Sequence, residues 1–312
     1  MTLPNSYYSR IAAFQREWKQ SVIVRTPLAL SIAAGGRSRG ADAFGILMYH
    51  RVTDAVRGYP FPTLNVTPQR FRSQLQGLLD RGHQAWPLRR ALDAHTAGEA
   101  IPRNVFVVTF DDGYANNFTQ AFPILRELGI PATIFIATAY LDTNEPFPFE
   151  DWTPAGLDGV PADSWRPLTT DECHAMLDSG IIELGAHTHT HTPYRHQPDP
   201  FREDLEKSMR ILCERFGYHD LTFAFPFGKR HHGLAGPTMY PAARQAGVLC
   251  ALTTENELVC PDSNPYDWGR FTVCQGDTGA TISAKLNGWY SFIRDGWRGI
   301  RRRTRAIGTK TT

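Results

Sequence analysis

The sequence lacks long apolar runs, paired cysteines and a strong net charge, and each absence argues against a class of protein. No apolar run approaches the ~20 residues that a helix needs to cross a bilayer, so we expect no transmembrane helix. The five cysteines are scattered without a CxxC pair, which argues against a disulfide framework and predicts free thiols or small buried side chains. A net charge of +2, without a recognised nucleic-acid motif, predicts no nucleic-acid partner.

The N-terminal region also lacks the order of a signal peptide. Charged side chains such as Arg10, Lys19 and Arg25 interrupt it before a short apolar run at residues 27–34. We therefore expect no secretion by the standard route, and a protein that lies in the cytoplasm or attaches peripherally to a membrane.

The chain is long enough for one main domain with additions at both ends. Its 312 residues, of which 42% are hydrophobic, can bury a full core without dividing. We predict a helical extension and Gly/Ser/Arg-rich linker over residues 1–43, the main domain over 44–280, and a basic amphipathic helix and tail over 281–312.

Within the main domain, short apolar runs alternate with helical patterns. Strands are predicted at residues 44–49, 105–110, 131–138, 181–186, 222–225 and 248–253, and helices at 67–80, 116–128, 170–179, 201–216 and 237–246. Thr67 is the expected N-cap of the first helix, Pro68 its first residue, and Gly129 the residue that ends the second. Strands separated by helices indicate parallel βαβ units and therefore an α/β fold.

Two adjacent carboxylates, Asp111 and Asp112, follow the strand predicted at residues 105–110. α/β barrels keep catalytic groups at the C-terminal ends of their strands. Because neighbouring side chains diverge there, one carboxylate is able to ligate a metal while the other faces a water molecule. Gly113 permits a sharp turn. A turn or helix cap is the alternative for an isolated Asp-Asp-Gly.

Three histidines, His187, His189 and His191, follow the strand predicted at residues 181–186. Histidine is the commonest metal ligand, and one aspartate with two histidines and an open position makes a catalytic site for Zn²⁺ or a similar ion. A solvated polar loop is the alternative for the histidines alone.

Together these segments resemble the polysaccharide deacetylase family, whose domain is also called the NodB homology domain. TFDDGY at 109–114 looks like the first family motif, HTHTH at 187–191 like the second and FAFPFG at 223–228 like the third, and GIPATIF at 129–135 resembles a connecting strand. The resemblance covers most of residues 44–275. It implies a distorted (β/α) barrel of about seven parallel strands.

The resemblance also assigns roles by position. It implies three ligands for a divalent metal, namely Asp112, His187 and His191, and leaves His189 as a non-ligand. It makes Asp111 the general base and the backbone N–H of Phe227 a donor to the oxyanion. Zn²⁺ is the expected ion, with Co²⁺ and Ni²⁺ as alternatives.

The chain departs from the common family pattern in two places. No histidine stands near the C-terminal end of the domain, where the usual general acid lies. Instead, MYH at 48–50 resembles the permuted branch that acts on exopolysaccharides, so we assign His50 as the general acid. Ala224 stands where many relatives have an arginine that pairs with the base, and we expect Arg270 to orient Asp111 instead. The alternative for His50 is a histidine at a strand end that lies in the core or only supports the metal ligands. The alternative for Arg270 is a surface ion pair.

These residues predict a metal-dependent hydrolase that removes N-acetyl groups from amino sugars of a polysaccharide or cell-envelope glycan. The metal would polarise the acetyl oxygen and activate water, and Asp111 would accept the water's proton. Deformylation or deacetylation of a lipid-linked amino sugar, or hydrolysis of an O-acetyl ester, would use the same groups. A catalytically degenerate carbohydrate-binding protein is the alternative from another class.

Two further segments are predicted to form contact surfaces. The loop at residues 142–167, rich in Pro, Phe and Trp, is expected to form one wall of the substrate groove. From Ile282 to Ile300, apolar residues recur every three or four positions opposite basic residues, so a basic helix over 282–305 is able to lie on an anionic membrane. A helix packed on the barrel with a solvated basic tail is the alternative.

Overall fold

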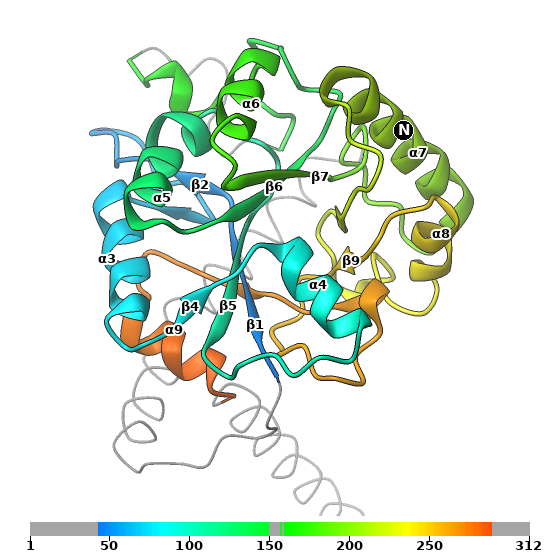
Figure 1. The fold of residues 1–312 in the computed structure, drawn as a ribbon. Helices are drawn as coiled ribbons and strands as arrows, with labels where there is room; N and C mark the ends of the chain where they lie inside the picture. Colours follow the sequence, from blue (N-terminus) through cyan, green and yellow to red (C-terminus); the bar gives the residue numbers. More distant parts are fainter. Residues whose placement is uncertain (1–42, 150–156, 158, 289–312) are drawn as a thin grey trace, which may run out of the picture.

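The computed structural model describes residues 43–149, 157 and 159–288 (Figure 1). Its central feature is a sheet built from β1 (Gly45–Tyr49), β5 (Val105–Phe110), β6 (Ala132–Ile136), β7 (Ile182–Ala186), β8 (Phe223–Ala224), β9 (Ala251–Leu252) and β10 (Phe271–Thr272). These strands follow the order β10-β1-β5-β6-β7-β8-β9, and every neighbouring pair is parallel. An eighth strand, β4 (Gln84–Ala85), pairs with the start of β5.

The sheet curves back until its two outer strands approach each other. Leu252 in β9 forms a parallel bridge with Trp268, which precedes β10 by three residues. The Thr253 N–H donates to the Trp268 carbonyl at 2.7 Å, and the Arg270 N–H donates to the Glu255 carbonyl at 2.8 Å. The prediction of a distorted (β/α) barrel of about seven parallel strands is therefore confirmed.

Side chains alternate between the inside and the outside of the barrel along each strand. On β5, Val105 and Val107 belong to an inner cluster that also includes side chains of β1, β6, β8, β9 and α4 (Leu88–Thr96). Phe106 and Val108 belong to an outer cluster with α3 (Pro68–Leu79), α5 (Phe122–Leu128), α6 (Thr170–Leu177) and α9 (Gly279–Leu286). Outside β8, a third cluster packs against α7 (Pro198–Phe216) and α8 (Tyr240–Gln245).

The helix ends follow the local sequence. Thr67 is the N-cap of α3, with Oγ1 accepting the Arg70 N–H at 3.3 Å and Pro68 in the first position. Gly129, with φ 64°, ends α5 in the left-handed conformation that glycine adopts without cost. Both predictions are confirmed.

The helix predicted over residues 116–128 is divided in the structure. Residues Asn117–Ala121 form a π-helical turn, η1, and the α-helix begins only at Phe122. Pro123 has no N–H for the regular α-helical bond to the preceding turn, which explains the break. The side-chain amide of Asn117, in the wide turn, donates to the His50 carbonyl at 2.8 Å.

Several short elements were not predicted, because two or three residues are too few to show a period. They are β2 (Arg51–Val52), β3 (Asn65–Val66), β4, β10 and the 3-10 turns η3 (Ala162–Ser164), η4 (Arg230–His232) and η5 (Pro265–Asp267). Helix α4 was also missed, although Leu88, Ala91 and Leu92 recur at helical spacing on its buried side.

The C-terminal end of the described chain packs on the barrel. Helix α9 begins one residue before the boundary predicted at 280. Its residues Ile282 and Leu286 are buried in the outer cluster, and Lys285 donates to the Asp277 carboxylate at 2.9 Å. Residues 1–42 and 289–312, with the predicted extension and most of the basic helix, lie outside the described residues. Over the described ranges, the helices are too short or too polar to span a bilayer.

Candidate active site

Asp111 and Asp112 stand at the rim of the barrel, directly after β5. The Asp111 N–H donates to the Tyr49 carbonyl at 3.0 Å and so extends the pairing of β5 with β1. Asp112 (φ 74°) and Gly113 (φ 84°) have left-handed backbone conformations, which turn the chain sharply away from the strand. Such a conformation is uncommon for aspartate and is concentrated at functional sites.

The HTHTH segment follows β7 on the same rim. The His187 N–H donates to the Ile136 carbonyl at 3.0 Å, so its backbone continues the strand pairing. Thr188 (φ 60°) and His191 (φ 57°) are left-handed, and the His191 N–H donates to Thr188 Oγ1 at 3.1 Å. The resulting loop returns His191 to the side of His187, with ring centroids 4.9 Å apart.

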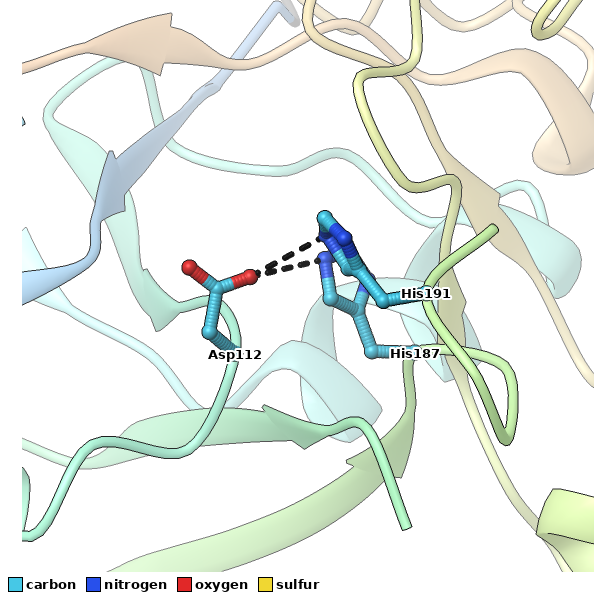
Figure 2. Close-up of side chains that lie close together, drawn as sticks. All are labelled: Asp112, His187 and His191. Atoms are coloured by element: carbon cyan, nitrogen blue, oxygen red, sulfur yellow. Dashed lines mark ion pairs between the residues drawn. The ribbon is translucent and has the colours of Figure 1, made fainter. Parts of the chain in front are cut away.

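Figure 2 shows Asp112, His187 and His191 converging on one point. The Nε2 atoms of His187 and His191 lie 3.4 and 3.2 Å from Asp112 Oδ1, and one donor atom from each residue lies within 4.8 Å of the others. His187 Nδ1 is 2.7 Å from the Ala224 carbonyl, so Nδ1 donates and Nε2 presents its lone pair to the cluster. The ring of His189 is turned elsewhere, toward Thr138 Oγ1 at 3.0 Å.

This donor set fits a divalent metal such as Zn²⁺. Asp112 Oδ1 is buried without a hydrogen bond, which is costly unless a cation satisfies it. Burial lowers the pKa of His191 and favours the neutral form that ligates metals. Burial raises the pKa of Asp112, but contacts with His187 and His191 outweigh burial and hold the pKa well below its ordinary value. The carboxylate is therefore ionised.

Asp111 forms a bidentate ion pair with Arg270, whose side chain is fully buried. The two guanidinium nitrogens donate to Oδ1 at 2.6 Å and to Oδ2 at 2.8 Å, while Thr109 and Thr253 accept two further bonds at 3.2 and 3.0 Å. Burial raises the pKa of Asp111, but Arg270, together with His187 and His50, outweighs burial and holds the pKa below its ordinary value. The predicted contact is present, and the alternative of a surface ion pair is wrong for Arg270.

His50 follows β1 and lies on the same rim. Its Nε2 atom is 3.9 Å from Asp111 Oδ2, and 14% of the side chain is exposed. Burial lowers the pKa of His50 despite the opposing effect of the Asp112 and Asp111 carboxylates. The structure thus brings the histidine of the MYH segment to the predicted base.

Aromatic side chains surround His191. The ring of Phe227, a residue with φ 58°, lies 4.8 Å from the His191 ring, and the ring of Phe149 lies 4.2 Å from it. Phe149 stacks on Phe147 at 5.1 Å, and Phe147 in turn contacts the rings of Tyr114 and Tyr140. Phe147 and Phe149 belong to the loop predicted to line the groove, whereas Tyr140 was missed because a single tyrosine outside a motif carries no signal.

About half of the chain matches a known family of proteins. Residues 98–249 match the family model of the polysaccharide deacetylases. The protein YxkH of Bacillus subtilis (strain 168) is 23% identical over 242 residues, which cover 77% of this chain and 75% of that protein. The poly-beta-1,6-N-acetyl-D-glucosamine N-deacetylase of Staphylococcus aureus (strain MSSA476) is 26% identical over 211 residues, and the match spans 65% of the length of each protein.

The structural comparison agrees with the sequence matches. The structure of IcaB from Ammonifex degensii has a TM-score of 0.65 at 22% identity, covers 80% of this chain and is itself covered to 98%. At this identity the likeness shows the fold. Fold, ordered motifs and family match agree, and the chain contains a polysaccharide deacetylase domain.

Proposed function

We propose that the protein is a metal-dependent hydrolase that removes N-acetyl groups from the amino sugars of a polysaccharide, with a glycan of the poly-N-acetylglucosamine type as substrate. The observation that carries the proposal is the division of labour between two adjacent carboxylates. Asp112 faces two imidazoles, whereas Asp111 is held ionised by Arg270. The Staphylococcus aureus relative, a poly-beta-1,6-N-acetyl-D-glucosamine N-deacetylase, supports the choice of acyl group and sugar.

The two carboxylates and the histidines have separate tasks in this reaction. Bound by Asp112, His187 and His191, a divalent cation would supply a Lewis acid for the acetyl carbonyl and the attacking water. Asp111 Oδ2 lies 4.0 Å from His187 Nε2 and is therefore close to the ligands. As an ionised carboxylate it accepts the proton of the attacking water, while Arg270 fixes its orientation.

His50 completes the proton transfer. Its lowered pKa favours the neutral form in the resting protein. A neutral His50, 3.9 Å from Asp111 Oδ2, takes up the proton that Asp111 received from water and donates it to the leaving nitrogen. The amine and acetate then leave, and both residues return to their starting protonation states.

The aromatic side chains and one backbone amide position the substrate. The N–H of Phe227 donates to the developing oxyanion, as the third motif implies. The rings of Phe147 and Phe149 offer apolar faces for a sugar ring close to His191. In this proposal, Phe147 and Phe149 belong to the wall of the substrate groove that was predicted at residues 142–167.

The test combines metal content with acetate release from N-acetylglucosamine oligomers. We expect the wild-type chain to bind one metal ion and to release acetate. Asp111→Asn should retain the metal and lose roughly 10²–10⁴-fold in kcat, as expected for loss of a general base. His187→Ala should lose the metal. Asp54→Asn makes the same chemical change as Asp111→Asn at an exposed position and should behave as wild type.

Each contrary result changes a specific part of the proposal. Metal retention in His187→Ala would contradict the ligand assignment. A wild-type chain that binds Zn²⁺ but releases acetate neither from oligomers nor from lipid-linked N-acetyl sugars would favour a carbohydrate-binding protein. Faster release of formate from N-formyl sugars, or of acetate from O-acetyl sugars, would replace the N-acetyl group as the substrate's acyl group.

A further inference from the structure

Asp204, on α7, contacts the backbone of the loop that joins two of the proposed metal ligands. Its Oδ2 atom accepts the N–H groups of His189 and Thr190, each at 3.0 Å. The Thr190 hydroxyl also donates to this carboxylate, at 3.2 Å to Oδ1 and 3.1 Å to Oδ2. One carboxylate therefore holds both of the central amides between His187 and His191.

The loop is also held from its other side, through two of its carbonyl groups. The Ala139 N–H donates to the His189 carbonyl at 2.9 Å, and the Tyr140 hydroxyl donates to the Thr190 carbonyl at 3.0 Å. Residues 138–140 therefore hold the loop by its carbonyls, whereas α7 holds it by its amides through Asp204. Removing Asp204 would leave the amides of His189 and Thr190 without these acceptors.

The loop needs such support because of its backbone conformation. Thr188 (φ 60°) and His191 (φ 57°) both adopt the left-handed conformation, which is unfavourable for residues with a Cβ atom and especially for a β-branched threonine. Strained conformations persist only where the surrounding structure imposes them. The direction of the His191 ring therefore depends on the bonds that hold residues 188–190.

Asp204 itself is held firmly. Its neighbours on α7, Phe201 and Leu205, are 2% and 0% exposed, and the Phe201 ring stacks on Phe225 at 5.5 Å. This packing fixes α7 against the outside of β8. The carboxylate is thus a rigid link between the barrel wall and the rim.

We propose that Asp204 is a positioning residue for the metal centre, which fixes the 188–190 loop so that His191 Nε2 faces Asp112 and His187. The proposal rests on the proposed function only in requiring that these three residues bind the metal. Residues that orient metal ligands typically contribute 10–100-fold to metal affinity. The tight contact of Asp204 with two amides places it in this class.

The experiment measures Zn²⁺ affinity by chelator competition and records the visible absorption spectrum of the Co²⁺-loaded protein, which reports ligand geometry. We expect Asp204→Ala to weaken Zn²⁺ binding at least about tenfold and to change the Co²⁺ spectrum. Asp204→Asn, which keeps one acceptor oxygen, should restore part of the affinity. Glu203→Ala removes an exposed carboxylate from the neighbouring position of α7 and should match the wild type.

Two controls separate this inference from the proposed function and from simple unfolding. His187→Ala must abolish binding if the ligand assignment holds. If it does so while Asp204→Ala keeps wild-type affinity and spectrum, the positioning role is overturned and the metal site stands. Thermal melting of the metal-free variants reports folding. A lowered melting temperature in Asp204→Ala with unchanged affinity and spectrum would show a merely structural residue and overturn the proposal.

Discussion

The buried ion pair between Arg270 and Asp111 allows a quantitative prediction for Arg270→Met. Two unit charges about 4 Å apart attract by about 4 kcal/mol at an effective dielectric constant of about 20. Each pKa unit corresponds to about 1.4 kcal/mol, so losing an attraction of this size should raise the pKa of Asp111 strongly. Burial would then be opposed only by His187 and His50, so the pKa of Asp111 should rise from its present position below the ordinary value.

The assay is the pH dependence of acetate release at equal metal occupancy. Because only ionised Asp111 accepts a proton, the acid limb of the pH–rate profile should lie at higher pH in Arg270→Met than in the wild type. Arg270→Lys, which keeps the charge but not the bidentate geometry, should shift less. Arg230→Met, which breaks pairs with Glu257 and Asp267 instead, is the matched control. An unchanged acid limb in Arg270→Met would refute the reasoning.

The same pair contributes to stability. The folded pKa of Asp111 lies below the unfolded value of about 3.9, so its ionisation stabilises the fold above that pH, and this contribution is lost as the pH falls through the folded pKa. Breaking a buried pair costs about 3–5 kcal/mol, and protonation of Asp111 relieves part of this. Melting curves of Arg270→Met at neutral pH must therefore accompany the kinetics, so that unfolding is not mistaken for a shifted pKa.

Three further predictions concern separate parts of the structure. His50→Gln should lower kcat roughly 10²-fold with metal content unchanged, and a wild-type kcat for acetate release would exclude His50 from proton transfer. Phe149→Ala should raise KM for oligomers about 2–10-fold and leave kcat within about twofold, while an unchanged KM would remove the ring from the groove. In Gly185→Ala, the new Cβ would lie 2.5 Å from ring atoms of Phe135, so urea denaturation should show a loss of about 1–3 kcal/mol, and equal stability would contradict this packing.

The cluster of proposed ligands was predictable because its three residues follow two parallel strands in the sequence. Asp112 follows the apolar run at 105–110, and His187 follows the run at 181–186. The C-terminal ends of parallel strands meet at one rim of the barrel. The periodicity of the strands and the order of the motifs were therefore enough to predict that these side chains lie close together. The same local signals predicted the N-cap Thr67 and the helix end at Gly129, since both depend on a few neighbouring residues.

The partner of Asp111 depended on closure of the barrel. Arg270 is 159 positions from Asp111, and Ala224 removes the family's usual signal for this cation. Only the pairing of β10 with β1, and the bridge between Leu252 and Trp268, bring the guanidinium inside the barrel. The partner of a buried charge is fixed by the packing of all the strands.

The surroundings of the second histidine were likewise decided by tertiary structure. The sequence alone defined the HTHTH spacing, which supplied the ligand types. The contacts of its loop with Asp204, and of His191 with Phe149, join segments that pack around the rim only after the sheet has formed. Residue type and local period are properties of the chain, whereas hydrogen-bond partners and ring contacts between distant segments arise only when the whole core is packed.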